Sequence, residues 1–199
     1  MYEHIDSWKN SEQAFVQQLN RNFDELRGEF PPHWKNFMKV VSPLGVNRVV
    51  DIGCGAGAYA YLCYMLQLDY MGYDYSEHAI NIAKEQWDND FVVANYTEIT
   101  SDHITDNDLI VANALCDVLP NGNECLEHLL SLGGKHILVQ RVRLTDEDNF
   151  FKEYTAYDIM TYEFHHNEKQ LEDTIHQAGY AFSKTNLYDN VWDLQIKRI

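Results

Sequence analysis

Three glycines alternate with small residues directly after a short apolar stretch that ends in a carboxylate and an isoleucine. The stretch is residues 48–52, the glycines are Gly53, Gly55 and Gly57, and Asp51 lies two residues before the first of them. Glycine allows the backbone to turn from strand to helix and lets a ligand approach main-chain N–H groups. The negative charge of Asp51 suits a ligand with a cationic amino group, whereas it would repel a pyrophosphate.

A second aspartate ends the next apolar stretch. Residues 68–73 precede Asp74, and Ser76 is of the residue type that caps a helix, here expected over 77–84. Asp74 stands where a ribose diol would be bound. The glycine loop alone also satisfies the dinucleotide fingerprint, so it does not by itself separate one nucleotide cofactor from another.

Taken together, Asp51 with its three glycines and the run Asp74-Tyr75-Ser76 resemble the first two motifs of the class I S-adenosylmethionine-dependent methyltransferases. The resemblance extends from about residue 45 to the C-terminus. It implies an α/β fold with a doubly wound, mostly parallel seven-stranded sheet, a C-terminal antiparallel hairpin and an N-terminal helical cap. It also implies that the cofactor is S-adenosylmethionine.

The resemblance assigns cofactor contacts to the matching positions. The amino-acid end would lie against Asp51 and the glycine loop, the ribose against Asp74, and the adenine against Tyr75. The side-chain amide of Asn95 could pair with the adenine amino group, although asparagine at a strand end also forms turns. The predicted cofactor-binding residues are Asp51, Gly53, Gly55, Gly57, Asp74, Tyr75, Asn95 and Asn113, the last facing the methionine portion through its main chain.

A general base is optional for this chemistry, because the cofactor supplies an activated carbon and only a hydroxyl acceptor must lose its proton. His165 and His166 are the predicted catalytic residues, since imidazole titrates near neutrality and both precede Asn167, which has the type and position of a helix cap. The alternative is that they are two surface histidines beside that cap. Weaker candidates for acceptor contacts are Asp117, Arg141, Tyr157, Tyr162 and Glu163.

The elements that position these residues alternate between strand and helix. Strands are expected at 48–52, 70–73, 91–95, 108–112 and 135–142, and helices at 56–66, 77–86 and 124–132. This alternation indicates a parallel sheet that is buried on both faces and binds its ligands at the carboxyl ends of the strands. Residues 181–188 and 191–198 predict a terminal hairpin joined by Asp189-Asn190.

The length of 199 residues suits a single domain. Residues 1–45 predict a helical cap that covers the cofactor and acceptor or simply packs against the sheet, and residues 46–199 predict the cofactor-binding core. Residues 143–167 are expected to be irregular and to form a lid or a substrate wall, because long connections at the active end of a sheet often do.

The amino-acid composition limits the classes of molecule with which this protein can associate. The 15 basic and 31 acidic residues give a net charge of −16, which repels polyphosphate backbones and argues against nucleic acid. No apolar run approaches the roughly 20 residues of a membrane span, and the first residues lack a signal-peptide pattern, so we expect a cytoplasmic protein. The four cysteines have no metal-binding or disulfide spacing, so no metal is predicted.

The sequence thus predicts a methyltransferase that acts on an oxygen or nitrogen of a small molecule. A non-catalytic module that binds S-adenosylmethionine or S-adenosylhomocysteine is one alternative. An NAD-dependent oxidoreductase is another, although it leaves Asp51 and the C-terminal hairpin unexplained. Neither the acceptor nor the oligomeric state can be read from these residues.

Overall fold

A single twisted sheet forms the centre of the computed structural model, which describes residues 2–199. Its main path runs in the order β3 (Asp90–Val93), β2 (Asp69–Asp74), β1 (Arg48–Ile52), β4 (Asp108–Asn113), β5 (His136–Thr145), β7 (Ile159–Asn167) and β6 (Phe150–Ala156). The first five strands of this path are parallel to one another. β8 (Tyr180–Tyr188) and β9 (Val191–Arg198) form the predicted terminal hairpin, and β9 pairs antiparallel with β5.

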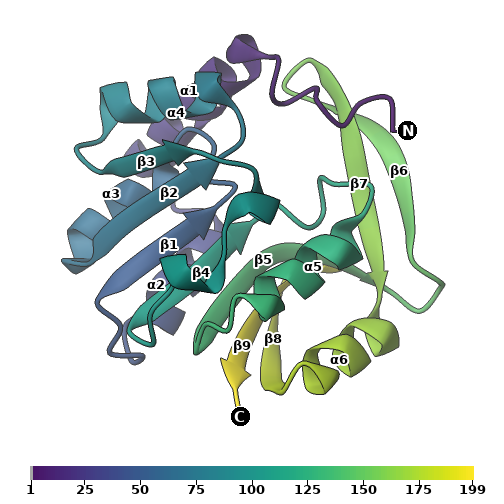
Figure 1. Cartoon of the computed structure of the whole chain (residues 1–199). Coiled ribbons are helices and arrows are strands. Elements are labelled where there is room, and N and C mark those ends of the chain that lie inside the picture. The colour runs from purple at the N-terminus through teal and green to yellow at the C-terminus, as the bar shows by residue number, and fades with distance from the viewer. Residues whose placement is uncertain (1) are drawn as a thin grey trace.

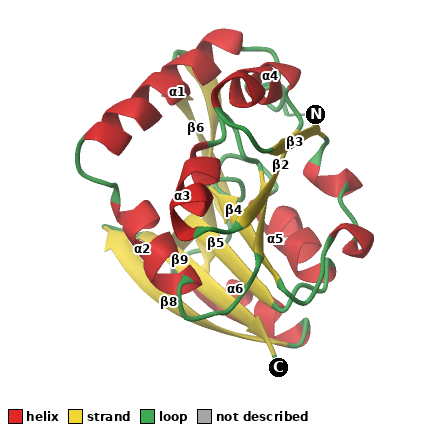
Figure 2. Cartoon of the chain, turned by 90° about the vertical axis from the view of Figure 1, so that its left-hand side faces the viewer, coloured by secondary structure: helices red, strands yellow, loops and turns green. Residues whose placement is uncertain are grey.

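Helices cover both faces of this sheet, as Figures 1 and 2 show. Side chains of α2 (Pro32–Val41), α3 (Ala58–Leu66) and α4 (Glu77–Gln86) form one core with Val49 and Val111. Side chains of α5 (Gly122–Ser131) and α6 (Glu168–Gln177) form a second core with Val50 and Ile110. Adjacent residues of one strand therefore belong to opposite cores, which is the arrangement of a doubly wound sheet. The α/β class and the mostly parallel sheet with its antiparallel C-terminal pair are confirmed.

The strand number differs from the prediction because residues 143–167 are regular. The sheet has nine strands, and this segment comprises the end of β5, all of β6 and β7, and the turn between them at Tyr157 and Asp158. β5 pairs with β4 over His136–Gln140 and then, along the same edge, with β7 over Arg143–Thr145. The β6–β7 hairpin therefore extends the sheet beyond the carboxyl end of β4, as Figure 1 shows.

The N-terminal residues lie against this hairpin. The main-chain N–H of His4 donates a hydrogen bond of 2.9 Å to the Tyr162 hydroxyl, and the indole of Trp8 donates one of 2.9 Å to Thr161. α1 (Glu12–Arg27) follows, and the side chain of Ser11 caps its first turn. The N-terminal cap thus spans from the β6–β7 hairpin to α4, which α1 contacts.

Short 3-10 helices at Tyr96–Glu98 and Ser101–His103 complete the fold. Within residues 2–199, no helix combines the length and the apolarity that a membrane crossing requires.

Candidate cofactor and acceptor site

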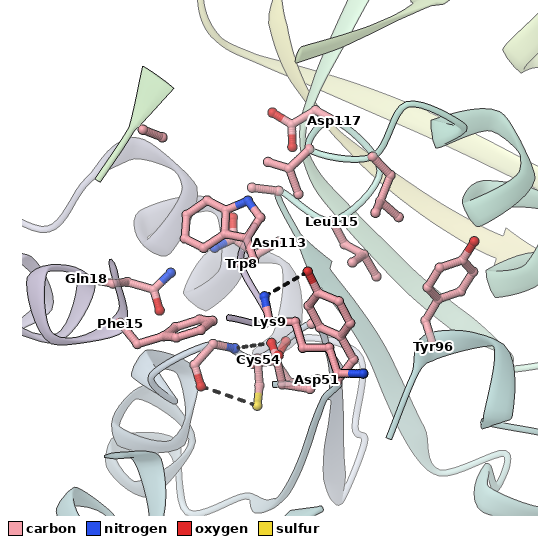
Figure 3. A pocket seen from close by; sticks show the side chains of 18 of the residues that line it. Trp8, Lys9, Phe15, Gln18, Asp51, Cys54, Tyr96, Asn113, Leu115 and Asp117 are labelled. Atoms are coloured by element: carbon pink, nitrogen blue, oxygen red, sulfur yellow. Dashed lines mark hydrogen bonds between the residues drawn. The ribbon is translucent and has the colours of Figure 1, made fainter. Parts of the chain in front are cut away.

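A cavity of about 1250 Å³ lies at the carboxyl ends of the parallel strands. The glycine loop and the ends of β2 and β4 form one part of its lining, and the N-terminal segment and the β6–β7 hairpin form the other. Figure 3 shows Asp117 in the upper part of the view and Asp51 below it, with Trp8 at a height between them. Ligand sites at this edge of a doubly wound sheet are expected, because strand ends and helix N-termini converge there.

Asp51 is the most deeply buried charged group of the lining, at 1% exposure. Its Oδ2 accepts a hydrogen bond of 2.8 Å from the Tyr70 hydroxyl, while its Oδ1 has no partner among residues 2–199. Burial raises the pKa of Asp51 to about 7, although the Tyr70 hydrogen bond opposes this change. A cationic group placed at Oδ1 would supply the missing partner and stabilise the ionised carboxylate.

The glycine loop has the backbone that its sequence predicts. Gly53, Gly55 and Gly57 adopt φ values of 78°, 53° and 77°. At Gly55, a Cβ would displace Oε1 of Gln18, which accepts a hydrogen bond of 2.7 Å from the main-chain N–H of Ala56. Glycine is favoured here because of its positive φ, and α1 of the cap contacts the loop directly through Gln18.

Asp74 ends β2 and is held by main-chain groups. Its two oxygens accept hydrogen bonds of 2.9 Å from the N–H groups of Gly55 and Ser76. Burial raises its pKa to about 6, and these two hydrogen bonds oppose the rise. Next to it, the Tyr75 hydroxyl accepts from the N–H of Lys9 and donates to the carbonyl of Ile5, each at 3.2 Å. Both predicted residues line the cavity, and Tyr75 also ties the N-terminal segment to β2.

The two predicted asparagines also line the cavity, but their side chains already have partners. Asn95 caps the first 3-10 helix, where its Oδ1 accepts from the N–H of Thr97 at 3.1 Å. The turn-forming alternative for Asn95 is therefore realised, while its amide NH₂ donates no hydrogen bond to any residue of the described range 2–199. Asn113 ends β4, and its Oδ1 accepts a hydrogen bond of 3.1 Å from Nε of Arg141.

The two predicted catalytic histidines are placed elsewhere. Both lie on β7 and neither is part of the cavity lining. His165 contacts Glu163 at 2.8 Å and stacks on Phe150, with 4.4 Å between ring centroids. Burial lowers the pKa of His166 to about 3, so this residue stays neutral. The structure thus does not bring His165 and His166 together with the predicted cofactor residues.

Asp117 is an acidic residue of the cavity lining that lies near Arg141 and Arg143. It is buried, its Oδ1 has no partner among the described residues, and its main-chain oxygen accepts a hydrogen bond of 2.7 Å from the N–H of Phe164 on β7. Burial raises the pKa of its carboxyl to about 6, while Arg141 and Arg143 partly offset the effect. Arg141, Arg143 and Tyr157 line the same part of the cavity, whereas Tyr162 and Glu163 do not.

Three lining or supporting residues were missed in the sequence. Gln18 had a signal, because it is a polar residue three positions after the aromatic Phe15 within the helical cap predicted over residues 1–45. No signal in the sequence indicated Tyr70 or His33, because their roles depend on cross-strand and interhelical packing.

The fold and the cavity define a doubly wound α/β protein whose glycine loop and buried Asp51 line a large cavity at the carboxyl ends of its parallel strands. The chain belongs to the methyltransferase domain family, whose model matches residues 46–188. This membership confirms the predicted class, an S-adenosylmethionine-dependent methyltransferase, and S-adenosylmethionine as its cofactor. An NAD-dependent oxidoreductase is not supported.

Solved structures share this fold. Magnesium protoporphyrin IX methyltransferase (ChlM) from Synechocystis PCC 6803 with bound SAM has 13% identity and a TM-score of 0.61, with 95% of this chain and 98% of that chain covered. Human N-acetylserotonin methyltransferase in complex with SAM has 16% identity and a TM-score of 0.68, over 98% of this chain and 59% of that chain. A DhpI–SAM–HEP complex has 13% identity and a TM-score of 0.66, over 99% of each chain. No match was found among curated proteins.

Proposed function

We propose that this enzyme transfers a methyl group from S-adenosylmethionine to an oxygen or nitrogen of a small molecule. The observation that carries the proposal is the cavity itself, which has the unpartnered, buried Oδ1 of Asp51 at one end and the acceptor-end group of Asp117, Arg141 and Tyr157 at the other. Two solved structures that share the fold are methyltransferases named for small molecules, N-acetylserotonin and magnesium protoporphyrin IX. This similarity supports a small acceptor here.

The residues of the cofactor half fit S-adenosylmethionine. Oδ1 of Asp51 would accept from its ammonium group, main-chain N–H groups of the loop at Gly53 and Gly55 would face its carboxylate, and Asp74 would accept from the ribose hydroxyls through its remaining lone pairs. Tyr75 and the free amide NH₂ of Asn95 are placed for the adenine, and the main chain near Asn113 for the methionine portion. The cofactor supplies the activated methyl carbon.

The chain's own residues must therefore align the acceptor and, where the acceptor is a hydroxyl, take up its proton. Asp117 suits the second task. Its pKa of about 6 leaves it ionised at neutral pH, and its unpartnered Oδ1 can accept a proton or a hydrogen bond. Burial also excludes the water that would otherwise compete for this oxygen. Asp117 thus replaces the two histidines as the proposed base.

Calorimetric titration with S-adenosylmethionine, S-adenosylhomocysteine and NAD in parallel tests the cofactor half. We expect the two sulfur ligands to bind and NAD not to bind. Release of S-adenosylhomocysteine is then followed with a panel of hydroxyl- and amine-bearing small molecules. Tight cofactor binding without turnover of any acceptor would instead identify a binding module, and binding of NAD alone would contradict the proposal.

A further inference from the structure

Three arginines line the acceptor half of a cavity in a protein whose net charge is −16. Two of them have carboxylate partners, because Arg21 lies 3.4 Å from Glu25 and Arg143 lies 3.0 Å from Glu163. Arg141 forms no ion pair with any residue of the range 2–199. Its Nε donates to Asn113, and its two terminal nitrogens donate no hydrogen bond to the described residues. Arg141 therefore presents a positive charge to the cavity without a direct ion pair, although Asp117 and Asp193 lie near enough to interact with it through space.

The backbone at Arg141 is held in an unusual conformation that directs this side chain. Its φ is 60°, and it lies at an irregularity of the β5–β9 register between Val139 and Val142. Its main-chain N–H donates a hydrogen bond of 3.0 Å to Oδ1 of Asp193. A left-handed backbone is unfavourable for a non-glycine residue, and such strain persists where surrounding contacts enforce it, often at functional sites.

Those surrounding contacts are buried and extensive. Asp193 is 1% exposed, and its Oδ2 accepts hydrogen bonds of 2.7 Å from both Asn36 and Gln140. Gln140 also donates to the carbonyl of His33 at 2.8 Å. The position of Arg141 is thus fixed by α2, β5 and β9 together, which preorganises its guanidinium before any ligand binds.

Two neutral polar groups without partners line the same part of the cavity. The Tyr157 hydroxyl is buried and has no hydrogen-bond partner among the described residues, and Cζ of Arg21 lies 5.4 Å from the centre of its ring. His33 is 5% exposed, and its Nε2 likewise has no partner. Burial, with the charges of Arg141 and Arg21, lowers the pKa of His33 to about 2, so its imidazole is neutral and available for hydrogen bonding.

We infer that the methyl acceptor carries an anionic group, a carboxylate or a phosphoryl group, that binds Arg141 together with Tyr157 and His33. This inference rests on the proposed function and names the acceptor class for the same cavity. A guanidinium with two free terminal nitrogens matches the paired oxygens of such an anion, and these charge-assisted hydrogen bonds are stronger than neutral ones. Asp117 lies in the same half but forms no ion pair with Arg141, so it leaves that cation available.

Binding of small anions to the cofactor-loaded protein tests the inference. The enzyme is saturated with S-adenosylhomocysteine and titrated with benzoate, phenylphosphonate and the neutral analogue benzamide. We expect at least one anion to bind about tenfold more tightly than benzamide, since a charged hydrogen-bonded pair is worth about 1.5–3 kcal/mol. The preferred anion then distinguishes a carboxylate from a phosphoryl acceptor.

Two variants assign the effect to Arg141. Arg141→Asn removes the cation and keeps a residue that tolerates positive φ, so we expect it to fold and to bind S-adenosylhomocysteine normally but to lose the preference for the anion. Arg27→Gln removes an arginine from the far end of α1, outside the cavity lining, and should keep that preference.

Other results would overturn the inference. Equal binding of benzamide and the anions, an unchanged preference in Arg141→Asn, or no detectable binding of either anion at millimolar concentration would each do so. Failure of the proposed function gives a different result, because either S-adenosylhomocysteine itself would not bind or the protein would turn over no acceptor, and the anion preference is measured without turnover.

Discussion

The hydroxyl of Tyr70 donates a hydrogen bond of 2.8 Å to Oδ2 of Asp51, and Oδ1 of that carboxylate has no partner among residues 2–199. Tyr70 belongs to β2 and Asp51 to β1, so the pairing of these two parallel strands determines which oxygen is available. The relationship makes Asp51 a preoriented partner for a cation. Because Tyr70 binds only Oδ2, the charge of the Asp51 carboxylate and the hydrogen bond that orients it can be removed by separate substitutions.

Replacement of Asp51 by Asn should weaken binding of S-adenosylmethionine by about tenfold to a hundredfold, since a hydrogen bond to a charged group is worth about 1.5–3 kcal/mol. The ligand-free variant should be at least as stable as the original, because a buried carboxyl with an unpartnered oxygen is replaced by a neutral amide. Calorimetry and thermal unfolding measure the two effects. Tyr70→Phe is the matched control, and it should alter affinity much less because Oδ1 is unchanged. Equal affinity of Asp51→Asn and the original would contradict this placement of the ammonium group.

The affinity for S-adenosylmethionine should increase as pH rises toward about 7 and then level off. The pKa of Asp51 is raised to about 7 in the ligand-free protein, and the ammonium group of the cofactor favours the ionised carboxylate, so binding below this pH releases a proton. The dissociation constant should change by up to about tenfold per pH unit in that range. Calorimetry in two buffers of different ionisation enthalpy measures the released proton. Asp51→Asn should abolish most of this dependence, and its persistence in that variant would assign it to another group.

Replacement of Asp117 by Asn should lower kcat for a hydroxyl acceptor by about a hundredfold or more, the usual contribution of a general base. At saturating cofactor, the original enzyme should lose activity as pH falls through about 6, because protonation of Asp117 removes the base. Cofactor affinity should be nearly unchanged. Asp173→Asn, an exposed position on α6, provides the control. An unaltered pH profile in Asp117→Asn would exclude Asp117 as the base.

Replacement of Gln18 by Ala should loosen the glycine loop. The substitution leaves the buried N–H of Ala56 without its acceptor, at a cost of about 1–3 kcal/mol. Faster hydrogen exchange at the Ala56 amide and weaker cofactor binding should result. Gln17→Ala is the matched control, because Gln17 makes an exposed hydrogen bond of the same length, 2.7 Å, to Asp158. If both variants behave alike, the contact between α1 and the loop has no special role.

Substitutions at two glycines distinguish the energetic cost of backbone strain from that of a steric conflict. Gly45 and Gly57 both have positive φ, but a Cβ at Gly45 meets nothing within 4 Å, whereas one at Gly57 would lie 2.8 Å from Trp87. Gly45→Ala should therefore lower the free energy of unfolding by about 1 kcal/mol. Gly57→Ala should lower it by about 1–3 kcal/mol more, because the packed ring must move. Urea unfolding at equal m-value measures the free energy of unfolding of both variants. Similar decreases in the two variants would show that the Trp87 ring moves aside at no energetic cost.

Local patterns in the sequence predict the parallel part of the fold well. β1 and α4 occupy the predicted residues, and the C-terminal hairpin begins one residue early. Each of these elements has a marker at its boundary, such as the glycines after β1 or the Ser76 cap before α4. The β6–β7 hairpin lacks such a marker, since its turn at Tyr157 and Asp158 uses positive φ without the glycine or asparagine that usually indicates it.

The candidate site likewise has one part that local sequence patterns predict and another part that they do not. Asp51, Asp74 and the glycines lie at the ends of local motifs, so their positions follow from short segments of sequence. The acceptor half depends on a strand that continues past its neighbour and on an N-terminal segment that returns to it. His165 and His166 illustrate the consequence, because they precede a correctly predicted helix cap at Asn167 but lie on a strand that no local pattern indicated.

The attachment of the β6–β7 hairpin has a consequence for how this enzyme could be redesigned. Arg143–Thr145 supply all of its pairing with β5, and this contact lies beyond the end of β4. Residues of the hairpin can therefore change without altering the register of the strands that carry Asp51 and Asp74. The acceptor wall is in this sense a replaceable module, and exchange of residues 150–160 should change which molecule is methylated while the cofactor half stays intact.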